Sequence, residues 1–190
     1  SSNRDCNNST TSKSDTCSQN ADINNEQNSC NGDSSNNNSN NNSNNNDNNQ
    51  NLNILDEVNK GATMGINAIS YIFPKVQDSD FKKVLNVEKN KYEKISERVN
   101  DLYANYSQKD PHETNTMEKI MTWYGIQMNT IKDNSTSKLS ELLMQGTNMG
   151  IIEGRRLINH NSNVGQDVKN ILNDFVVMQE DSVETLKKYL

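Results

Sequence analysis

The chain has 190 residues and a formal net charge of −6, and 31% of its residues are hydrophobic, against roughly 45–50% apolar residues in an ordinary globular chain. No run approaches the roughly 18 consecutive apolar residues of a membrane-spanning helix, so no membrane span is expected. Neither residues 1–51 nor residues 52–190 have the excess of basic residues that binding to a phosphate backbone requires, which argues against nucleic-acid binding. A removed targeting segment ahead of Ser1 stays an open alternative.

The hydrophobic residues are unevenly distributed along the chain. Residues 1–51 contain 20 Asn and 11 Ser but only five hydrophobic residues, and their net charge is −4. Such a segment has too little apolar surface to offset the entropy cost of ordering its backbone, so residues 1–51 are predicted to form a disordered Asn/Ser-rich tail. Residues 52–190 contain every aromatic residue and every Met. They are predicted to form one domain with a single core.

All three cysteines, Cys6, Cys17 and Cys30, lie in the predicted tail. Their odd number and wide spacing suit neither a closed disulfide framework nor a zinc site, which needs close pairs and four ligands. Two interpretations stay open, a thiol handle for cross-linking on a flexible arm and three incidental cysteines.

From Ile54 onward, apolar residues recur every three or four positions, which predicts amphipathic helices. The first helix is expected over about 54–76. A second helix follows the potential caps Asp78-Ser79-Asp80 and runs to about residue 106. Polar residues around Pro111 then break the pattern. A shorter third helix is expected over about 117–131.

Two more helices complete the predicted domain. Asp133-Asn134-Ser135 can cap a fourth helix that ends near residue 159, and its apolar face is predicted to be Leu139, Leu142, Met149 and Ile152. The last helix follows a turn at 160–165 and runs from Val168 to Leu186. No window has the alternating pattern of a strand, so the predicted class is all-α.

An internal repeat relates the two ends of the predicted domain. Gly61-Ala-Thr-Met-Gly-Ile66 recurs as Gly146-Thr-Asn-Met-Gly-Ile151, and residues 81–86 match residues 168–173 at an offset of 87. Two helical hairpins of similar pattern, joined by a long connection with a short extra helix, predict an up-down four-helix bundle with one crossover.

This arrangement resembles the ferritin-like superfamily, in which two antiparallel hairpins are joined by a long crossover. The sequence is also similar to uncharacterised ferritin-like proteins of clostridia, and three stretches carry the similarity: 60–66, 123–130 and 144–151. The resemblance covers roughly residues 54–190 and implies a ferritin-like bundle. It also implies a bacterial setting, in the cytoplasm or in a spore or envelope layer.

Active ferritin-like proteins hold two metal ions with a Glu from each of two helices and a Glu-x-x-His from each of the other two. The nearest candidates here are Glu88, with Lys91 three residues later, and Glu180, with Val183 three residues later. Further carboxylates that could face the core on the first and fourth helices are Glu57, Glu141 and Glu153. The only histidines, His112 and His160, lie in predicted connections. No metal or other cofactor is therefore expected, and a metal-binding or redox bundle with an atypical carboxylate site is the alternative.

Five glycines at spacings of four lie within predicted helices: Gly61, Gly65, Gly146, Gly150 and Gly154. Each costs about 1 kcal/mol relative to Ala in a helix, so a compensating contact is expected. The favoured interpretation is a close crossing between the first and fourth helices of one monomer. A dimer face and a small-molecule cleft are the alternatives.

No residues in the sequence combine a nucleophile with a base, and no phosphate-binding loop is present, so the chain is not expected to be an enzyme. The sequence instead predicts a non-catalytic bundle with a structural or protein-interaction role, through a protein partner or through self-association. A regulator whose bundle binds a partner helix is a further alternative.

Overall fold

The computed structural model describes residues 40–109, 111, 122, 124–127, 129 and 132–190. Within these ranges the regular secondary structure is entirely helical and no strand occurs, which confirms the all-α class. The expectations for residues 1–39, including Cys6, Cys17 and Cys30, lie outside the described residues, as does His112. Of the expected helix over 117–131, residues 122, 124–127 and 129 are described, and all are helical.

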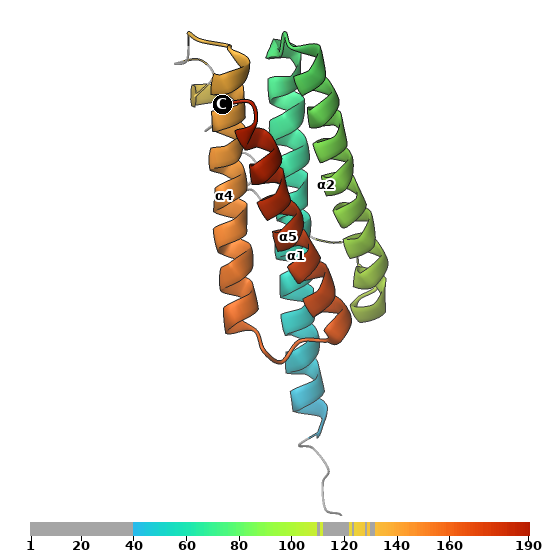
Figure 1. Ribbon diagram of the computed structural model, residues 1–190. Coiled ribbons are helices and arrows are strands. Elements are labelled where there is room, and N and C mark those ends of the chain that lie inside the picture. Colours follow the sequence, from blue (N-terminus) through green and yellow to red (C-terminus); the bar gives the residue numbers. More distant parts are fainter. Residues whose placement is uncertain (1–39, 110, 112–121, 123, 128, 130–131) are drawn as a thin grey trace, which may run out of the picture. The chain divides into compact units, whose positions relative to one another are not determined.

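Four long helices form two hairpins. Helix α1 (Asn40–Ile72) is followed by a 3₁₀ turn, η1 (Phe73–Lys75), and α2 (Ser79–Tyr106), and the second hairpin consists of α4 (Thr136–His160) and α5 (Gln166–Lys187). In Figure 1, α1 and α5 run in one direction and α2 and α4 run in the other. Because α2 and α4 are parallel, the end of α2 and the start of α4 lie at opposite ends of the bundle.

The predicted caps begin two of these helices. The Asp78 side chain accepts a hydrogen bond of 2.7 Å from the Phe81 N–H at the start of α2, and the Ser135 hydroxyl accepts one of 3.3 Å from the Lys138 N–H at the start of α4. Each bond satisfies one of the N–H groups that the first turn of a helix leaves without a backbone acceptor. Both helix starts depend on a capping side chain next to them in the sequence, so they could be predicted from the sequence.

Helix α1 begins earlier than predicted. Residues 40–51 are helical, although they were expected to belong to the disordered tail. The buried Asn51 explains part of this difference. Its Oδ1 accepts a hydrogen bond of 2.8 Å from the N–H of Gly165, in the turn between α4 and α5, and its Nδ2 donates one of 2.9 Å to the Asp47 carbonyl. An argument from apolar content alone cannot detect such a polar contact.

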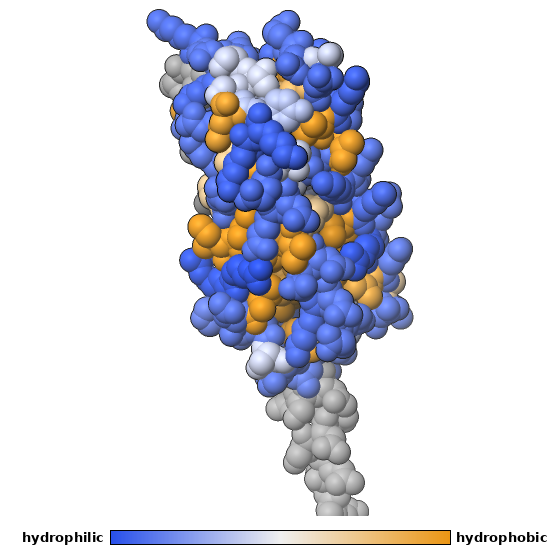
Figure 2. All heavy atoms as spheres, viewed as in Figure 1, coloured by the Kyte–Doolittle hydropathy of each residue, from blue (hydrophilic) through white to orange (hydrophobic). Residues whose placement is uncertain are grey.

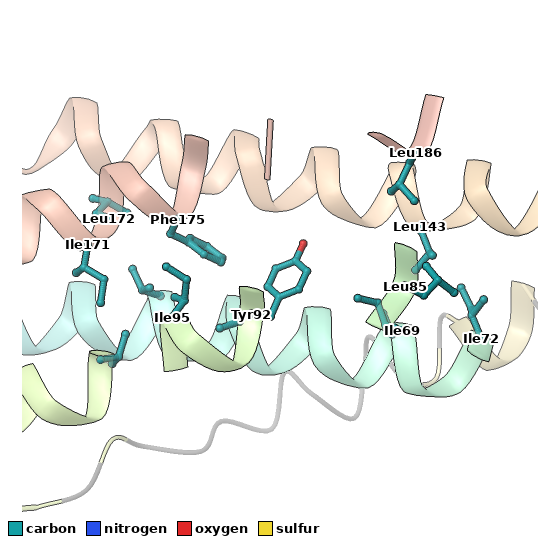
Figure 3. Close-up of a cluster of buried hydrophobic side chains, with 14 of the residues drawn as sticks. Ile69, Ile72, Leu85, Tyr92, Ile95, Leu143, Ile171, Leu172, Phe175 and Leu186 are labelled. Carbon is teal, nitrogen blue, oxygen red and sulfur yellow. The ribbon is translucent and has the colours of Figure 1, made fainter. Parts of the chain in front are cut away.

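One hydrophobic core joins the four helices. In Figure 3, one group of side chains includes Ile171 and Phe175, and a second group farther along the bundle includes Leu85 and Leu186. Tyr92 stands between the two groups, and its hydroxyl points into the space between the helices.

The prediction for the apolar face of α4 is correct in the first half of the helix and wrong in the second. Leu139 and Leu142 are buried, but Met149 is 54% exposed and Ile152 is 56% exposed. The inner face of the second half is instead formed by Gly146, Thr147, Gly150 and Gly154. Glycines carry no apolar side chain, so a search for apolar spacing selected the exposed Ile152 and Met149, which borders the cavity although it is half exposed.

The described helices include none that is long and apolar enough to cross a membrane.

A glycine-lined cavity as the candidate functional site

A cavity of about 420 Å³ lies between the helices and is partly open to the surface, and residues of all four long helices together with Tyr124 line it. All five predicted glycines are in its wall: Gly61, Gly65, Gly146, Gly150 and Gly154. Sites for small molecules usually have volumes of about 300–1,000 Å³. The glycines thus border an interior space large enough to hold a ligand.

On α1, the missing glycine side chains make room for aromatic rings of other helices. A Cβ atom at Gly61 would lie 2.7 Å from Cζ of Phe175 on α5, and one at Gly65 would lie 2.6 Å from the ring of Tyr92 on α2. Real Cβ atoms do not approach a ring so closely. An alanine at either position would therefore push a buried ring aside.

The glycines of α4 face side chains in the same way. Gly146 faces the Tyr124 hydroxyl, Gly150 faces the Gln179 amide oxygen, and Gly154 faces a methyl group of Val176. The sequence favoured a direct crossing of the first and fourth helices at these glycines. In the structure, side chains from α2, α5 and residue 124 occupy the space that the glycines leave.

A buried carboxylate lies in the wall of the cavity. Glu88 on α2 is only 3% exposed. One of its oxygens, Oε1, is 2.9 Å from the Lys91 ammonium group, and the other, Oε2, accepts a hydrogen bond from the Ser182 hydroxyl on α5. A buried charge is tolerated when it is paired and hydrogen-bonded in this way. Both oxygens of Glu88 therefore already have partners.

Two buried tyrosines also line the cavity. Burial raises the pKa of Tyr92 to about 12, with a smaller rise from the nearby charge of Glu88, while a hydrogen bond with Thr147 lowers this pKa. Burial also raises the pKa of Tyr124. Both side chains are therefore neutral phenols at neutral pH.

Gln179 on α5 is a deeply buried polar residue of the cavity wall, at 2% exposure. Its Nε2 donates a long hydrogen bond of 3.4 Å to the Phe175 carbonyl. Its Oε1 lies beside Gly150, and among the described residues the structure gives this oxygen no hydrogen-bond donor. This acceptor is therefore available to a molecule in the cavity.

Three of the carboxylates considered as metal ligands, Glu57, Glu88 and Glu153, line the cavity, but the described residues form no cluster able to hold a metal ion. Glu88 is in the interior, whereas Glu180 pairs with Arg155 on the surface at 2.7 Å. The remaining candidates pair with cations three residues away on the same helix: Glu57 with Lys60, Glu141 with Lys138 and Glu153 with Arg156. His160 lies at the exposed end of α4, where its Nδ1 is 2.7 Å from the Arg156 carbonyl.

The described part of the chain contains no group of three or more His, Cys, Asp or Glu side chains able to hold a metal ion. The single interior carboxylate, Glu88, already binds a lysine and a serine. A dinuclear centre of the ferritin-like type needs several carboxylates and imidazoles around the same point. The described donors do not fit such a centre.

The internal repeat relates the polar groups of the cavity to one another. At the offset of 87 residues, Tyr92 corresponds to Gln179, and these two side chains face Gly65 and Gly150, which match each other at an offset of 85. Glu88 corresponds to Phe175, and Ser182 corresponds to Ile95. The cavity thus lies between two similar hairpins whose side chains differ in polarity.

Sequence reasoning missed Gln179, Ser182 and Thr147 as parts of the site. Gln179 lies four residues after Phe175, and Ser182 lies four residues before Leu186. Both positions share the buried face of α5. Polar residues at buried positions of a helical stripe are the signal that could have located them.

No family model, curated protein or solved structure matches the chain. The chemistry of the cavity has to be interpreted from its own residues. A largely apolar wall with a few polar side chains is the usual composition of a site that binds a small molecule.

Proposed function

We propose that the chain is a non-catalytic binding protein of ferritin-like architecture, and that the glycine-lined cavity is its binding site. The observation that carries the proposal is a cavity of about 420 Å³ bordered by five glycines in a bundle with one hydrophobic core. The parallel arrangement of α2 and α4 supports the ferritin-like assignment, since it requires one long crossover.

The binding of an apolar fluorescent probe tests this proposal. We expect 1-aminoanthracene to bind the full chain with one-to-one stoichiometry and with increased emission. Ala68→Met extends a buried side chain in the cavity wall and should weaken binding at least tenfold. Val87→Met, on the exposed surface of α2, is the matched control and should leave binding unchanged. Absence of saturable binding, or equal effects of the two variants, would contradict the proposal.

The donor set of the cavity argues against the alternative of a metal-binding or redox bundle. Glu88 and Glu180 were its leading ligands, and they lie in different surroundings, one buried and one paired with Arg155 at the surface. Metal analysis of the purified chain separates the two possibilities. Stoichiometric iron or manganese that disappears in Glu88→Ala would overturn the non-catalytic proposal.

A protein-interaction role is the second candidate, and it rests on the outer surface of the second hairpin. Ile152 on α4 is more than half exposed, and Val177 on α5 is also exposed. Figure 2 shows hydrophobic patches among the hydrophilic residues on the face where α4 and α5 lie. A spore or envelope layer is the setting implied by the sequence resemblance. An Ile152→Asp variant that loses self-association in a size measurement, while it still binds the probe, would support this role.

A further inference from the structure

The amide oxygen of Gln179 is an unused acceptor in the wall of the cavity. Gln179 is 2% exposed, and its Nε2 group already donates to the backbone of α5. Within the described residues no donor is directed at Oε1, which lies next to Gly150. A buried acceptor without a partner costs free energy, because it has lost its hydrogen bonds to water.

We propose that the cavity binds a neutral, mostly apolar molecule that carries one hydrogen-bond donor, and that this donor binds Oε1 of Gln179. This inference rests on the proposed function and specifies the ligand class of the same site. The glycine at 150 is part of the arrangement, because a side chain there would occupy the position of Oε1.

The apolar character of the ligand follows from the rest of the wall. Most of the lining residues are hydrophobic, among them Met64, Leu85, Leu143, Leu172 and Phe175. A ligand that covers these side chains removes apolar surface from water, which is the main favourable contribution to binding in such a site.

The charges around the cavity favour a neutral ligand over an ion. Glu57, Glu88 and Glu153 line the cavity, and Lys60 is the lining cation among the described residues. An anion deep in the cavity would therefore meet the buried charge of Glu88 as well as the oxygen of Gln179. A cation would gain little, because Lys91 already neutralises Glu88. An uncharged hydroxyl or amide N–H suits Gln179 without the cost of burying an unpaired charge.

Three naphthalene derivatives of similar size test the inference by calorimetric titration of the full chain. 1-Naphthol carries a donor, 1-methoxynaphthalene lacks it, and 1-naphthoate is an anion. A hydrogen bond to a buried acceptor supports a preference of about tenfold. We therefore expect 1-naphthol to bind about ten times more tightly than 1-methoxynaphthalene, and 1-naphthoate to bind most weakly.

Substitution of Gln179 by an apolar side chain of similar length should remove the preference. In Gln179→Met, we expect the two neutral compounds to bind with equal affinity. Gln166→Met, at an exposed glutamine of the same helix, is the control and should keep the preference. If Gln179→Met does not fold, Gly150→Ala gives the same test, since its Cβ displaces the amide oxygen and should also equalise the two affinities.

The outcomes separate the inference from the proposed function. Equal binding of both neutral compounds by the unmodified chain overturns the role of Gln179 and leaves the binding function intact. A preference that persists in Gln179→Met, or tighter binding of 1-naphthoate, also overturns the inference. Failure of all three compounds, together with failure of 1-aminoanthracene, overturns the proposed function itself.

Discussion

The Ser182 hydroxyl on α5 donates a hydrogen bond to the Glu88 carboxylate on α2, although 94 residues separate them in the chain. The contact joins the two hairpins inside the core. Glu88 was the candidate metal ligand on the second helix. In the structure this carboxylate instead binds a hydroxyl group of the last helix. The same carboxylate reaches the partly exposed Lys91, so its charge is balanced at the edge of the core.

Loss of this hydroxyl should destabilise the bundle. Ser182→Ala leaves Oε2 of Glu88 buried without its donor, and we expect the free energy of unfolding to fall by about 1–3 kcal/mol. Ser70→Ala, at an exposed position of α1, should change it by less than about 0.5 kcal/mol. Urea unfolding of both variants measures the difference, and equal midpoints would show that the contact contributes nothing.

Alanine should have opposite effects at two helical glycines. At Gly65 the new Cβ would lie 2.6 Å from the Tyr92 ring, so we expect Gly65→Ala to destabilise the fold by about 1–3 kcal/mol. At Gly125 the nearest atom, the Tyr71 hydroxyl oxygen, would lie at an ordinary 3.6 Å. Gly125→Ala should therefore leave stability unchanged or raise it by up to about 1 kcal/mol through helix propensity. Thermal unfolding gives the sign of each effect, and a stabilised Gly65→Ala would exclude a tight contact with Tyr92.

The buried Tyr92 predicts a loss of stability at high pH. Its pKa in the folded chain is about 12, against about 10 in an unfolded chain. The unfolded state therefore loses its proton first as the pH rises. The stabilisation is complete below pH 10 and is lost as the pH rises toward and through 12, by roughly 2 kcal/mol at pH 12.

Urea unfolding between about pH 9 and about pH 12 tests this expectation against Tyr92→Phe. The variant lacks the phenol group and should lose less stability over this range than the unmodified chain. Burial and the neighbouring Asp167 also raise the pKa of Tyr106 to about 12, so part of the pH dependence should persist in the variant. Identical curves for the two proteins would contradict the burial of the Tyr92 hydroxyl.

Asn51 is predicted to differ from its asparagine neighbours. Asn51→Ala removes the acceptor for the Gly165 N–H and should lower the free energy of unfolding by about 1–2 kcal/mol. The exposed Asn49 offers a matched control in a sequence of the same composition, and Asn49→Ala should have almost no effect. In a thermal scan the first variant should unfold several degrees below the second. Equal melting temperatures would show that the hydrogen bond between Asn51 and Gly165 does not stabilise the fold.

The helical class and the helix starts at Asp78 and Ser135 could be predicted because they depend on local features. Apolar spacing and side-chain caps act within one or two turns of the chain. The inner face of α4 could not be predicted in the same way, since glycines form it. Their partners come from residues distant in sequence, such as Gln179.

The candidate site was predicted only in part. The sequence singled out the five glycines, but it favoured helix crossing over a cleft, because spacing alone does not show which side chains fill the space. Glu88 was considered as a metal ligand of the second helix, yet its partner Ser182 could not be identified from the sequence. Such a contact depends on how two hairpins pack, and the repeat shows only that the hairpins are similar.

The parallel directions of α1 and α5 place the two ends of the described bundle far apart. The first turn of α1 and the carboxyl terminus lie at opposite ends (Figure 1), and Tyr189 packs against Phe81 near the start of α2. At 1.5 Å per residue, the 33 residues of α1 span about 50 Å. A fluorophore or surface anchor attached after Leu190 would therefore leave the Asn51 end untouched. Distance measurements between labels at the two ends could then follow any stretching or opening of the bundle when a ligand enters.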